Sequence, residues 1–526
     1  MSNSLLSQES WSGRLYTAAD IAIIGAGLSG LTAAYRILKK DPSLRVIVLE
    51  AKDDVGGRTQ TVLLKVAGGG KEPFDVGGQW VDSGQDDIML LLDELEITSF
   101  PQYRDGKKVF EFGAHLKTED NCFIPACSWY CRFQLNSFVR KVENIMKRIN
   151  WNEPLEDPYV KELDSMTLET FLNCHLQTQL AVGIMKSFIQ TCIGAESSQI
   201  SALYFISFVN GKQGFINKLK LIFPGDDTQR IMNGAHYISM RLAEEIGDSL
   251  ELGDNVIEVV QLDETVDIMT ASQKLYRCQY AIMAIPPSEV QKIYFMPPLP
   301  AQHKKLLDHF PAGHMIKFVA TYNEAFWREK ELSGEAVSDG GLDPAEFPIS
   351  MTYDLTTPGG HPAIGGHITG SQMDSFILRS ADKRKQLVLH HLLKLFGEEA
   401  LRPIDYVEKN WCEELYIGGC PIQYLTPGVM SCKHFMRQPF IRVYWAGTEA
   451  AVSWFGYMNG AVQAGNVAAL ETLYQLRPQC LTALDLIQVH RCFPVTRPPS
   501  GIPWWLLWVS LGLIGVAYIA YRMYKR

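Results

Sequence analysis

The chain has 526 residues, of which 47% are hydrophobic and 20% charged, and its formal net charge is −9. A chain of this length can bury more than one core and is expected to form more than one domain. The negative charge argues against a nucleic-acid partner, and the 11 scattered cysteines, without a CxxC pair or histidines at zinc spacing, predict no metal site.

The first predicted unit is a strand, a glycine turn, a helix and a second strand between Asp20 and Glu50. The apolar sequence IAIIGAG runs into a GxGxxG motif made by Gly25, Gly27 and Gly30. In such a motif the first glycine permits the tight turn, the second lets the backbone approach a pyrophosphate, and the third allows close packing of helix on strand. The carboxylate of Glu50 ends the second strand, where it can accept ribose hydroxyls. The unit therefore predicts a dinucleotide site, and an acid at that position disfavours a 2′-phosphate.

Two glycine-rich loops follow this unit. The first would bring backbone and a fixed arginine close to a second phosphate, and the second would supply another close backbone approach, expected beside a flavin ring. An NAD enzyme does not need these extra loops, so they favour FAD. The residues that they place at the cofactor are Lys52, Gly57, Arg58, Gly77, Gly78, Gln79 and Trp80.

Strand-like segments recur much later, at 255–262, 266–271, 280–287 and 441–446, and the stretches 86–215 and 301–400 between them are expected to be rich in helix. The predicted fold class is α/β, with a Rossmann-like FAD-binding domain interrupted by an α+β substrate domain. The expected segments are an N-terminal extension (1–17), the FAD-binding domain (18–86, 216–295 and 405–467), the substrate domain (87–215 and 296–404) and a C-terminal connector (468–500).

The end of the chain predicts a membrane anchor. Residues 502–521 carry no charge over 20 positions, which at about 1.5 Å per residue matches the roughly 30 Å thickness of a bilayer core. Tryptophans at its start and tyrosines at its end are typical of a membrane interface. The alternative is a buried core helix. The N-terminus is a poor signal peptide, so we expect a tail-anchored protein, with residues 501–526 as a transmembrane helix and the body in the cytosol.

The last third of the chain contains a series of motifs that sets the family. They are Asn410-Trp411-Cys412-Glu413-Glu414, Gly418-Gly419-Cys420, Arg437-Gln438-Pro439, Ala446-Gly447-Thr448-Glu449 and Tyr457-Met458-Asn459-Gly460. Together with the first segment, this order of motifs resembles the flavin-containing monoamine oxidase family, over residues 20–470 approximately.

The resemblance implies how FAD is held. In the family, the cysteine of the Gly-Gly-Cys motif bonds covalently to the 8α-methyl group of the flavin through a thioether, and Cys420 stands at that position. The motif with Thr448 and Glu449 is expected beside the ribityl and phosphate groups. The backbone of Val256 is expected at the adenine. Trp411, Tyr457 and Met458 complete the predicted cofactor site.

Lys317 is the predicted catalytic lysine. In HMIKFVATY, alternation places it on one face of a strand with Met315 and Val319. Most lysines are solvated, but a buried one would have a lowered pKa and could hold a water molecule by hydrogen bonding. The family has a lysine in the corresponding strand, linked through water to flavin N5. We therefore assign catalytic roles to Lys317, Tyr457 and Cys420.

The sequence departs from the family in the substrate pocket. Family members follow the flavin cysteine with a tyrosine, which forms an aromatic cage for the amine with a second tyrosine. Tyr457 matches the second wall, but the first position is Pro421, which lacks the ring quadrupole. Tyr416 or Tyr424 could compensate. Met351 and Tyr353 are the other expected pocket residues, with Met351 where a bulky aromatic is often found.

The peptide bond between Cys420 and Pro421 is predicted to be cis, because family members are reported to use a cis peptide there. A cis bond costs X–Pro only about 0.5–1 kcal/mol, against roughly 2.5–4 kcal/mol elsewhere.

The expected reaction is the oxidative deamination of a primary or secondary amine by O2. It gives H2O2 and an imine, which hydrolyses to an aldehyde and ammonia or an amine. Two alternatives stay open: a non-covalent polyamine or amino-acid oxidase, and a membrane-tethered flavoprotein with reduced or lost turnover.

The family resemblance and the basic residues that flank the anchor favour the mitochondrial outer membrane, facing the cytosol, with the endoplasmic reticulum membrane as the alternative. The family commonly forms homodimers.

Overall fold

The computed structural model of the protein describes residues 15–119, 128–151, 154–210, 215 and 227–492. Its nucleotide-binding part is built on a five-stranded sheet in which all neighbours are parallel. In order across the sheet, the strands are β11 (Leu250–Glu251), β3 (Val46–Leu49), β2 (Ile21–Ile24), β15 (Tyr280–Met283) and β22 (Val443–Trp445). The β2 and β3 strands are apolar and buried at every position, as expected for a parallel sheet covered on both faces.

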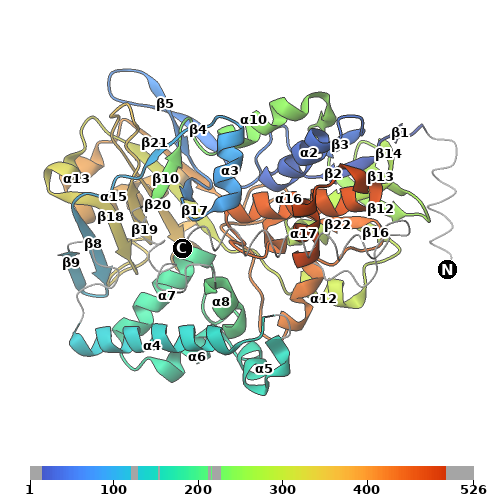
Figure 1. Cartoon of the computed structure of the whole chain (residues 1–526). Coiled ribbons are helices and arrows are strands. Elements are labelled where there is room, and N and C mark those ends of the chain that lie inside the picture. The colour runs from blue at the N-terminus through green and yellow to red at the C-terminus, as the bar shows by residue number, and fades with distance from the viewer. Residues whose placement is uncertain (1–14, 120–127, 152–153, 211–214, 216–226, 493–526) are drawn as a thin grey trace, which may run out of the picture.

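Helices α2 (Leu28–Lys40) and α16 (Met458–Leu476) pack against each other beside this sheet. A second, mixed sheet lies next to it and contains β1 (Thr17–Ala18), β14 (Leu275–Cys278), β13 (Val266–Thr270), β12 (Val256–Gln261) and β16 (Tyr294–Met296). The early and late segments of the chain thus meet in one part of the molecule, where blue and red ribbons lie together in Figure 1.

The other half of the molecule contains a seven-stranded mixed sheet, seen at the left of Figure 1. Its strands, in order, are β21 (Asp405–Asn410), β17 (Met315–Thr321), β20 (Ala363–Thr369), β19 (Met351–Asp354), β18 (Leu332–Ser338), β8 (Lys107–Phe112) and β9 (His115–Glu119). The stretch 301–400, which was expected to be rich in helix, therefore contains the four strands β17 to β20 besides its helices. Every residue of β17, β18 and β20 is buried, so these strands lack the alternation of apolar and polar residues that marks a half-exposed strand.

The register of this sheet sets a row of side chains beside one another. Lys317 of β17 lies directly opposite His367 of β20, and His367 lies opposite Met351 of β19. Residues paired across neighbouring strands project from the same face of a sheet. The register therefore gathers a lysine, a histidine and a methionine from three strands at one place.

Helices cover the remaining sides. The helical segment below the large sheet in Figure 1 contains α4 (Trp129–Arg148), α5 (Pro158–Ser165), α6 (Leu168–His175), α7 (Gln179–Ile193) and α8 (Ala202–Val209). The other helices are α3 (Asp86–Glu94), α10 (His236–Ile246), α11 (Pro287–Val290), α12 (Ala301–Asp308), α13 (Phe326–Glu329), α14 (Gln372–Phe376), α15 (Ala381–Phe396) and α17 (Ala483–Cys492). The smaller sheets contain β4 (Thr61–Lys65) with β5 (Lys71–Asp75), and β6 (Trp80–Asp82) and β7 (Ser99–Pro101) on either side of β10 (Thr228–Ile231).

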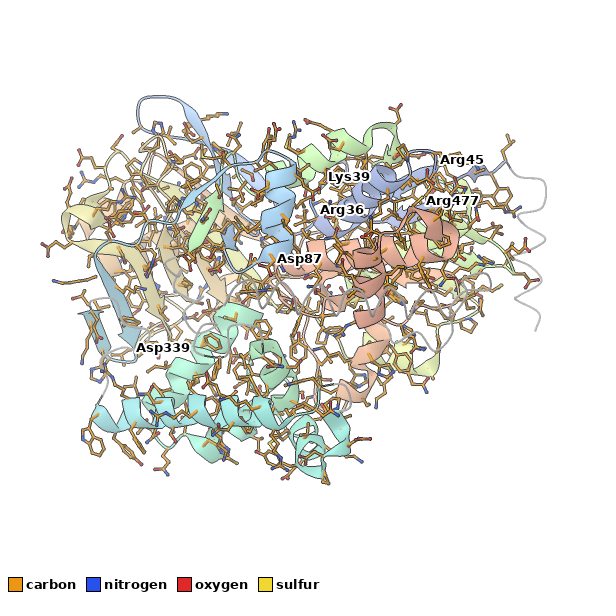
Figure 2. The ribbon with its side chains drawn as sticks, viewed as in Figure 1. Arg36, Lys39, Arg45, Asp87, Asp339 and Arg477 are labelled. Atoms are coloured by element: carbon orange, nitrogen blue, oxygen red, sulfur yellow. The ribbon has the colours of Figure 1, made fainter. Side chains whose placement is uncertain are left out.

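Helix α3 forms polar contacts with both α2 and α16. Arg36 and Lys39 of α2, labelled in Figure 2, form ion pairs with Glu94 of α3 at 2.5 and 2.8 Å. At the other end of α3, the Asp87 carboxylate accepts hydrogen bonds from Asn459 and Gln463 of α16, both at 3.2 Å. These contacts fix the start of α16, which carries the predicted site residues Tyr457 and Met458.

The fold class expected from the sequence needs one correction, which concerns the transmembrane helix. The predicted span, residues 502–521, lies outside the residues that the structure describes. Within the described part of the chain, no helix is both long and apolar enough to cross a bilayer. We therefore correct the predicted fold class: the described residues form the two-domain fold and contain no helix that could cross a membrane. The domain boundaries and the localisation stay predictions.

The prediction for the backbone after Cys420 is confirmed. The Cys420–Pro421 bond is cis, as is Met296–Pro297.

Candidate active site

One cavity of about 360 Å³ joins the two halves of the molecule. It begins at the carboxyl ends of the parallel strands, where Gly25, Glu50 and Gly447 line it, and it reaches Lys317 and Met351 of the seven-stranded sheet. Ligands of open α/β sheets bind in the crevice outside the carboxyl ends of the strands. The cavity therefore lies where the GxGxxG motif predicts a dinucleotide.

The nucleotide end of the cavity is shaped by glycines. Gly25 has a φ of +103°, and a Cβ at Gly30 would stand 2.0 Å from the Gly25 carbonyl oxygen, so neither position tolerates a side chain. A Cβ at Gly57 would be 3.3 Å from the Cα of Gly27, which shows how closely the two glycine loops approach. Helix α2 begins after Gly27 without a side-chain cap, so its first N–H groups stay free to bind an anion.

Two polar side chains at this end have capacity to bind a nucleotide. The hydroxyl of Ser29, buried in the first turn of α2, has no hydrogen-bond partner among the described residues. The Glu50 carboxylate accepts from the backbone N–H groups of Ala26 at 2.6 Å and Lys52 at 3.0 Å. Burial raises the pKa of Glu50, although these two hydrogen bonds act in the opposite direction. The arrangement presents a carboxylate of fixed orientation at the end of β3.

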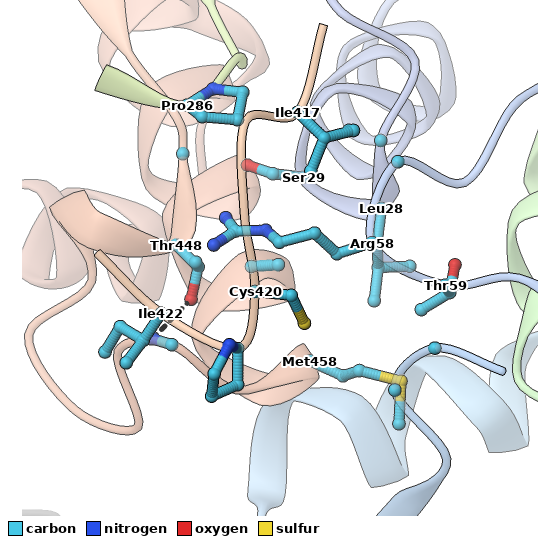
Figure 3. A pocket seen from close by; sticks show the side chains of 18 of the residues that line it. Leu28, Ser29, Arg58, Thr59, Pro286, Ile417, Cys420, Ile422, Thr448 and Met458 are labelled. Carbon is cyan, nitrogen blue, oxygen red and sulfur yellow. Dashed lines mark hydrogen bonds between the residues drawn. The ribbon is translucent and has the colours of Figure 1, made fainter. Parts of the chain in front are cut away.

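Arg58 is held in the middle of the cavity by Glu449. Its Nη1 lies 2.7 Å from Glu449 Oε1 and its Nη2 lies 3.3 Å from Oε2, and the Glu449 side chain is only 1% exposed. Figure 3 shows Arg58 beside Cys420, with Met458 lining the same space. A fixed arginine of this kind suits a phosphate or another anionic group.

Cys420 stands on a tightly confined loop. Its backbone N–H donates to the Gly313 carbonyl at 2.9 Å. Gly419 has a φ of +145°, and a Cβ there would be 2.5 Å from the Gly313 oxygen and 2.6 Å from the Ala312 Cβ. The Cys420 thiol is 8% exposed and lines the cavity. Burial raises its pKa to about 12, against the opposing charges of Arg58 and Lys317.

Lys317 is buried at the centre of the cavity, with 2% of its surface exposed. Its ammonium donates to the Gly77 carbonyl at 2.9 Å and to the side-chain carbonyl of Gln79. Burial lowers the pKa of Lys317 to about 7; Asp75 acts against this shift and Arg230 adds to it. The lysine is thus buried and has a lowered pKa, as the sequence led us to expect.

The substrate end of the cavity is lined by side chains of the helical segment, the large sheet and the loops around them. They are Trp80, Thr191, Cys192, Phe208, Lys317, Met351, His367, Pro421, Ile422 and Tyr457. The Tyr457 ring is stacked on Phe208, with centroids 6.4 Å apart and an angle of 13° between the planes. The backbone around Tyr457 is fixed by the Thr448 hydroxyl, which donates to the Tyr457 carbonyl at 3.1 Å. One flat aromatic wall is therefore present, and Pro421 also lines the cavity.

Three further rings meet beside Lys317. Trp80 lies edge-on to Tyr353 with centroids 4.7 Å apart, and the Tyr353 hydroxyl is 3.0 Å from Nε2 of His367. The Lys317 ammonium lies 5.6 Å from the centre of the Tyr353 ring. Burial and the neighbouring charge of Lys317 lower the pKa of His367 to about 3, so the imidazole is neutral.

The comparison with known proteins decides the family. Residues 28–473 match the family described as flavin containing amine oxidoreductase. The chain belongs to this family. It is 36% identical over 470 residues to amine oxidase [flavin-containing] A of Canis lupus familiaris, covering 87% of this chain and 85% of that protein. It is 33% identical over 452 residues to a probable flavin-containing monoamine oxidase A of Dictyostelium discoideum, covering 85% and 96%.

A solved structure leads to the same conclusion. The wild-type putrescine oxidase bound to putrescine superposes with a TM-score of 0.79 at 25% identity, over 87% of this chain and all of that one. The resemblance drawn from the sequence is confirmed, and the protein is a flavin-dependent amine oxidase.

The residues of this amine oxidase fit FAD. Among the described residues, the glycine surfaces, the unpaired Ser29 hydroxyl and the free N–H groups of α2 suit a pyrophosphate, and Glu50 suits a ribose. Arg58, Cys420 and Lys317 line the same cavity, and Figure 3 shows Arg58 beside Cys420. These features match the donors and the space that a dinucleotide needs.

Most of the residues predicted from the sequence line this cavity. They are Gly25, Gly27, Glu50, Gly57, Arg58, Gly77, Gly78, Gln79, Trp80, Val256, Lys317, Met351, Trp411, Cys420, Pro421, Thr448, Tyr457 and Met458. Gly30, Lys52, Glu449 and Tyr353 do not line it: Glu449 acts behind Arg58, and Tyr353 lies behind His367. Of the two tyrosines considered as replacements in the amine cage, Tyr416 lines the cavity and Tyr424 does not. The individual roles stay predictions.

Sequence reasoning missed several liners, namely Thr191, Cys192, Phe208 and His367. Of these, His367 has a recognisable signal. It is the only charged or imidazole residue within the otherwise small or apolar strand sequence AIGGHIT. A histidine in a fully buried strand needs a polar partner or a ligand.

Proposed function

We propose that this amine oxidase acts on monoamines with an apolar body and holds its FAD covalently at Cys420. The products would be an aldehyde, ammonia or an amine, and H2O2, formed from the substrate, O2 and water. The observation that carries the proposal is the single cavity that joins the glycine-rich nucleotide end, Cys420 and the buried Lys317 to an aromatic substrate end. Bound FAD would supply the electron acceptor for the amine and the route by which the electrons reach O2.

The protein's own contribution is to orient the amine and to exclude water. The Tyr457 ring, supported by Phe208, offers a flat face to the substrate. Met351, Ile422 and Pro421 add apolar surface. Lys317 is held at two acceptors in a water-poor site, and an ammonium has a third N–H that can bind a water molecule or the cofactor.

The preference for monoamines rests on charge. The carboxylates that line the cavity within the described part of the chain are Glu50, Asp82 and Glu289, and none is among the substrate-end residues named above. Asp82, which shares β6 with Trp80, accepts a hydrogen bond from the backbone N–H of Gly84 at 2.9 Å. Glu50 binds backbone N–H groups, and Glu289 is paired with Lys292. A diamine such as putrescine carries a second ammonium, whose burial without a carboxylate is costly. The substrate end thus favours an amine with one charge, in contrast to the putrescine oxidase that shares the fold.

A peroxide-coupled screen tests this substrate class. Arylalkylamines and aliphatic monoamines are expected to produce H2O2, whereas putrescine and longer polyamines are expected to produce little. Activity with polyamines that exceeds activity with every monoamine would contradict the proposal.

The covalent bond is supported by position. Cys420 lines the cavity, as Arg58 and Pro421 do, and it lies beside Arg58 in Figure 3. The family's thioether cysteine corresponds to it. Acid precipitation of the holoenzyme should leave the yellow flavin in the pellet, whereas Cys420→Ser should release it to the supernatant. A yellow supernatant from the wild type would show a non-covalent cofactor and leave the amine oxidation untouched.

A further inference from the structure

His367 is a buried polar residue at the substrate end, and only one of its two ring nitrogens is used by the fold. His367 lines the cavity, is 9% exposed and has no hydrogen-bond partner for its Nδ1 among the described residues. A buried polar group without a partner costs about 1–3 kcal/mol. The histidine lies directly opposite Lys317 in the register of the sheet, next to the predicted reaction centre.

The hydrogen bond with Tyr353 decides which nitrogen of His367 carries the proton. In the described structure, the Tyr353 hydroxyl has His367 Nε2 as its partner, at 3.0 Å. If the hydroxyl donates to Nε2, a neutral imidazole carries its proton on Nδ1, and only that N–H is left unpaired. If Nε2 donates instead, both the tyrosine proton and the Nδ1 lone pair are unpaired. The first arrangement leaves fewer unpaired groups and is favoured.

The imidazole stays neutral in this arrangement. The pKa of His367 is lowered to about 3 by burial and by the charge on Lys317. Its Nδ1–H is therefore a donor over the whole range in which the enzyme would work, and an oxygen of a bound ligand can accept from it. Trp80, the other ring with an N–H at this end, already donates to Gln102 at 3.0 Å.

We propose that His367 determines specificity by donating a hydrogen bond from Nδ1 to a hydroxyl oxygen on the substrate, so that hydroxylated arylalkylamines bind better than their unsubstituted counterparts. This rests on the proposed monoamine substrate. The hydroxyl can be on the carbon next to the reacting one or on the aromatic ring. At either position, the hydroxyl oxygen is the acceptor for the Nδ1–H of His367.

The test measures binding with ligands that cannot react. The ligands are α,α-dimethyl-2-phenylethylamine, which lacks the hydrogen that oxidation removes, and its derivatives with a hydroxyl at the β-carbon or at ring position 4. Dissociation constants are read from the change in absorbance of the bound flavin, for the wild type and for His367→Phe. Thr191→Val is the matched control. Among the described residues, the Thr191 hydroxyl is a second unpaired side-chain donor at the substrate end, and valine is a nearly isosteric replacement without it.

In the wild type, at least one hydroxylated ligand should bind about tenfold more tightly than the parent. His367→Phe should abolish that advantage while the parent binds as before, and Thr191→Val should preserve it. Tyr353→Phe frees Nε2 and should reduce the advantage at least threefold, roughly, which gives a second result if His367→Phe does not fold.

Three results would each overturn the proposal: no advantage in the wild type, an advantage that survives in His367→Phe or is unchanged in Tyr353→Phe, or an advantage removed by Thr191→Val. The parallel oxidation of 2-phenylethylamine tests the proposed function separately, because the blocked ligands bind without turnover.

Discussion

The ammonium of Lys317 donates to the side-chain carbonyl of Gln79, which follows the Gly77–Gly78 pair by one residue. The same ammonium donates to the Gly77 carbonyl at 2.9 Å. A lysine of β17 in the large sheet is thereby fixed to a loop of the nucleotide-binding part. This contact connects the two halves of the cavity at the predicted reaction centre.

The first prediction concerns the pH dependence of stability. The pKa of Lys317 falls from 10.5 in the unfolded chain to about 7 in the folded protein. Between these values the unfolded chain binds more protons, so the contribution of Lys317 to the unfolding free energy rises with pH from about 7 to 10.5 and is most unfavourable below pH 7. Relative to Lys317→Met, which lacks the group, the wild type should gain melting temperature as pH rises through this window. Parallel curves for the two proteins would contradict the lowered pKa.

The second prediction concerns Gln79 as a positioning residue for Lys317. Its carbonyl favours the charged form of the lysine by accepting a hydrogen bond. The pH at which amine-dependent flavin reduction changes should move down in Gln79→Leu and up in Gln79→Glu. Stopped-flow rates of flavin reduction across pH measure this shift, with Lys317→Met as the control that lacks the transition. If the wild type, Gln79→Leu and Gln79→Glu all show the transition at the same pH, Gln79 does not tune the pKa of Lys317.

The third prediction concerns the Arg58–Glu449 pair. Glu449→Gln leaves a largely buried guanidinium without its counter-charge, which should lower the unfolding free energy by about 3–5 kcal/mol and reduce the flavin content. Chemical denaturation and the absorbance ratio of flavin to protein measure the two effects. Glu399→Gln is the control, because the Lys330–Glu399 pair is exposed and should contribute nothing measurable.

The fourth prediction concerns the packing of α7 against the loop of Cys420. Gly194, which ends α7, has a φ of +75°, and a Cβ there would be 2.9 Å from Pro421 Cδ and 2.8 Å from the His314 nitrogen. Gly194→Ala should cost on the order of 1–2 kcal/mol from backbone conformation alone and should weaken substrate binding by displacing Pro421. Gly183→Ala, within the same helix and with nothing near its Cβ, should instead stabilise the protein by about 0.5–1 kcal/mol. Thermal unfolding and KM distinguish the two variants.

The sequence predicted the nucleotide end well because its signals are local. The motif with Gly25, Gly27 and Gly30 stands between strand and helix as expected, and Glu50 ends the next strand. The cis bond before Pro421 was predicted from the family resemblance, together with the low cost of a cis bond before proline. Each of these features depends on residues that are close in the chain.

The substrate end was harder to predict because it depends on sheet register. His367 and Lys317 are far apart in sequence but lie opposite each other on β20 and β17. The strands are buried on both faces, so the sequence alone does not show which face turns to the cavity. Similarly, the contacts that Gln79 makes with Lys317 and Glu449 with Arg58 join distant segments, which no local pattern reveals.

The central claim, that this cavity oxidises monoamines, is tested most directly by anaerobic mixing of the holoenzyme with 2-phenylethylamine while the flavin absorbance is recorded. We expect the flavin to be bleached, O2 to restore its colour with formation of H2O2, and Lys317→Met to slow the cycle. A flavin that dithionite reduces but that no monoamine bleaches would contradict the claim.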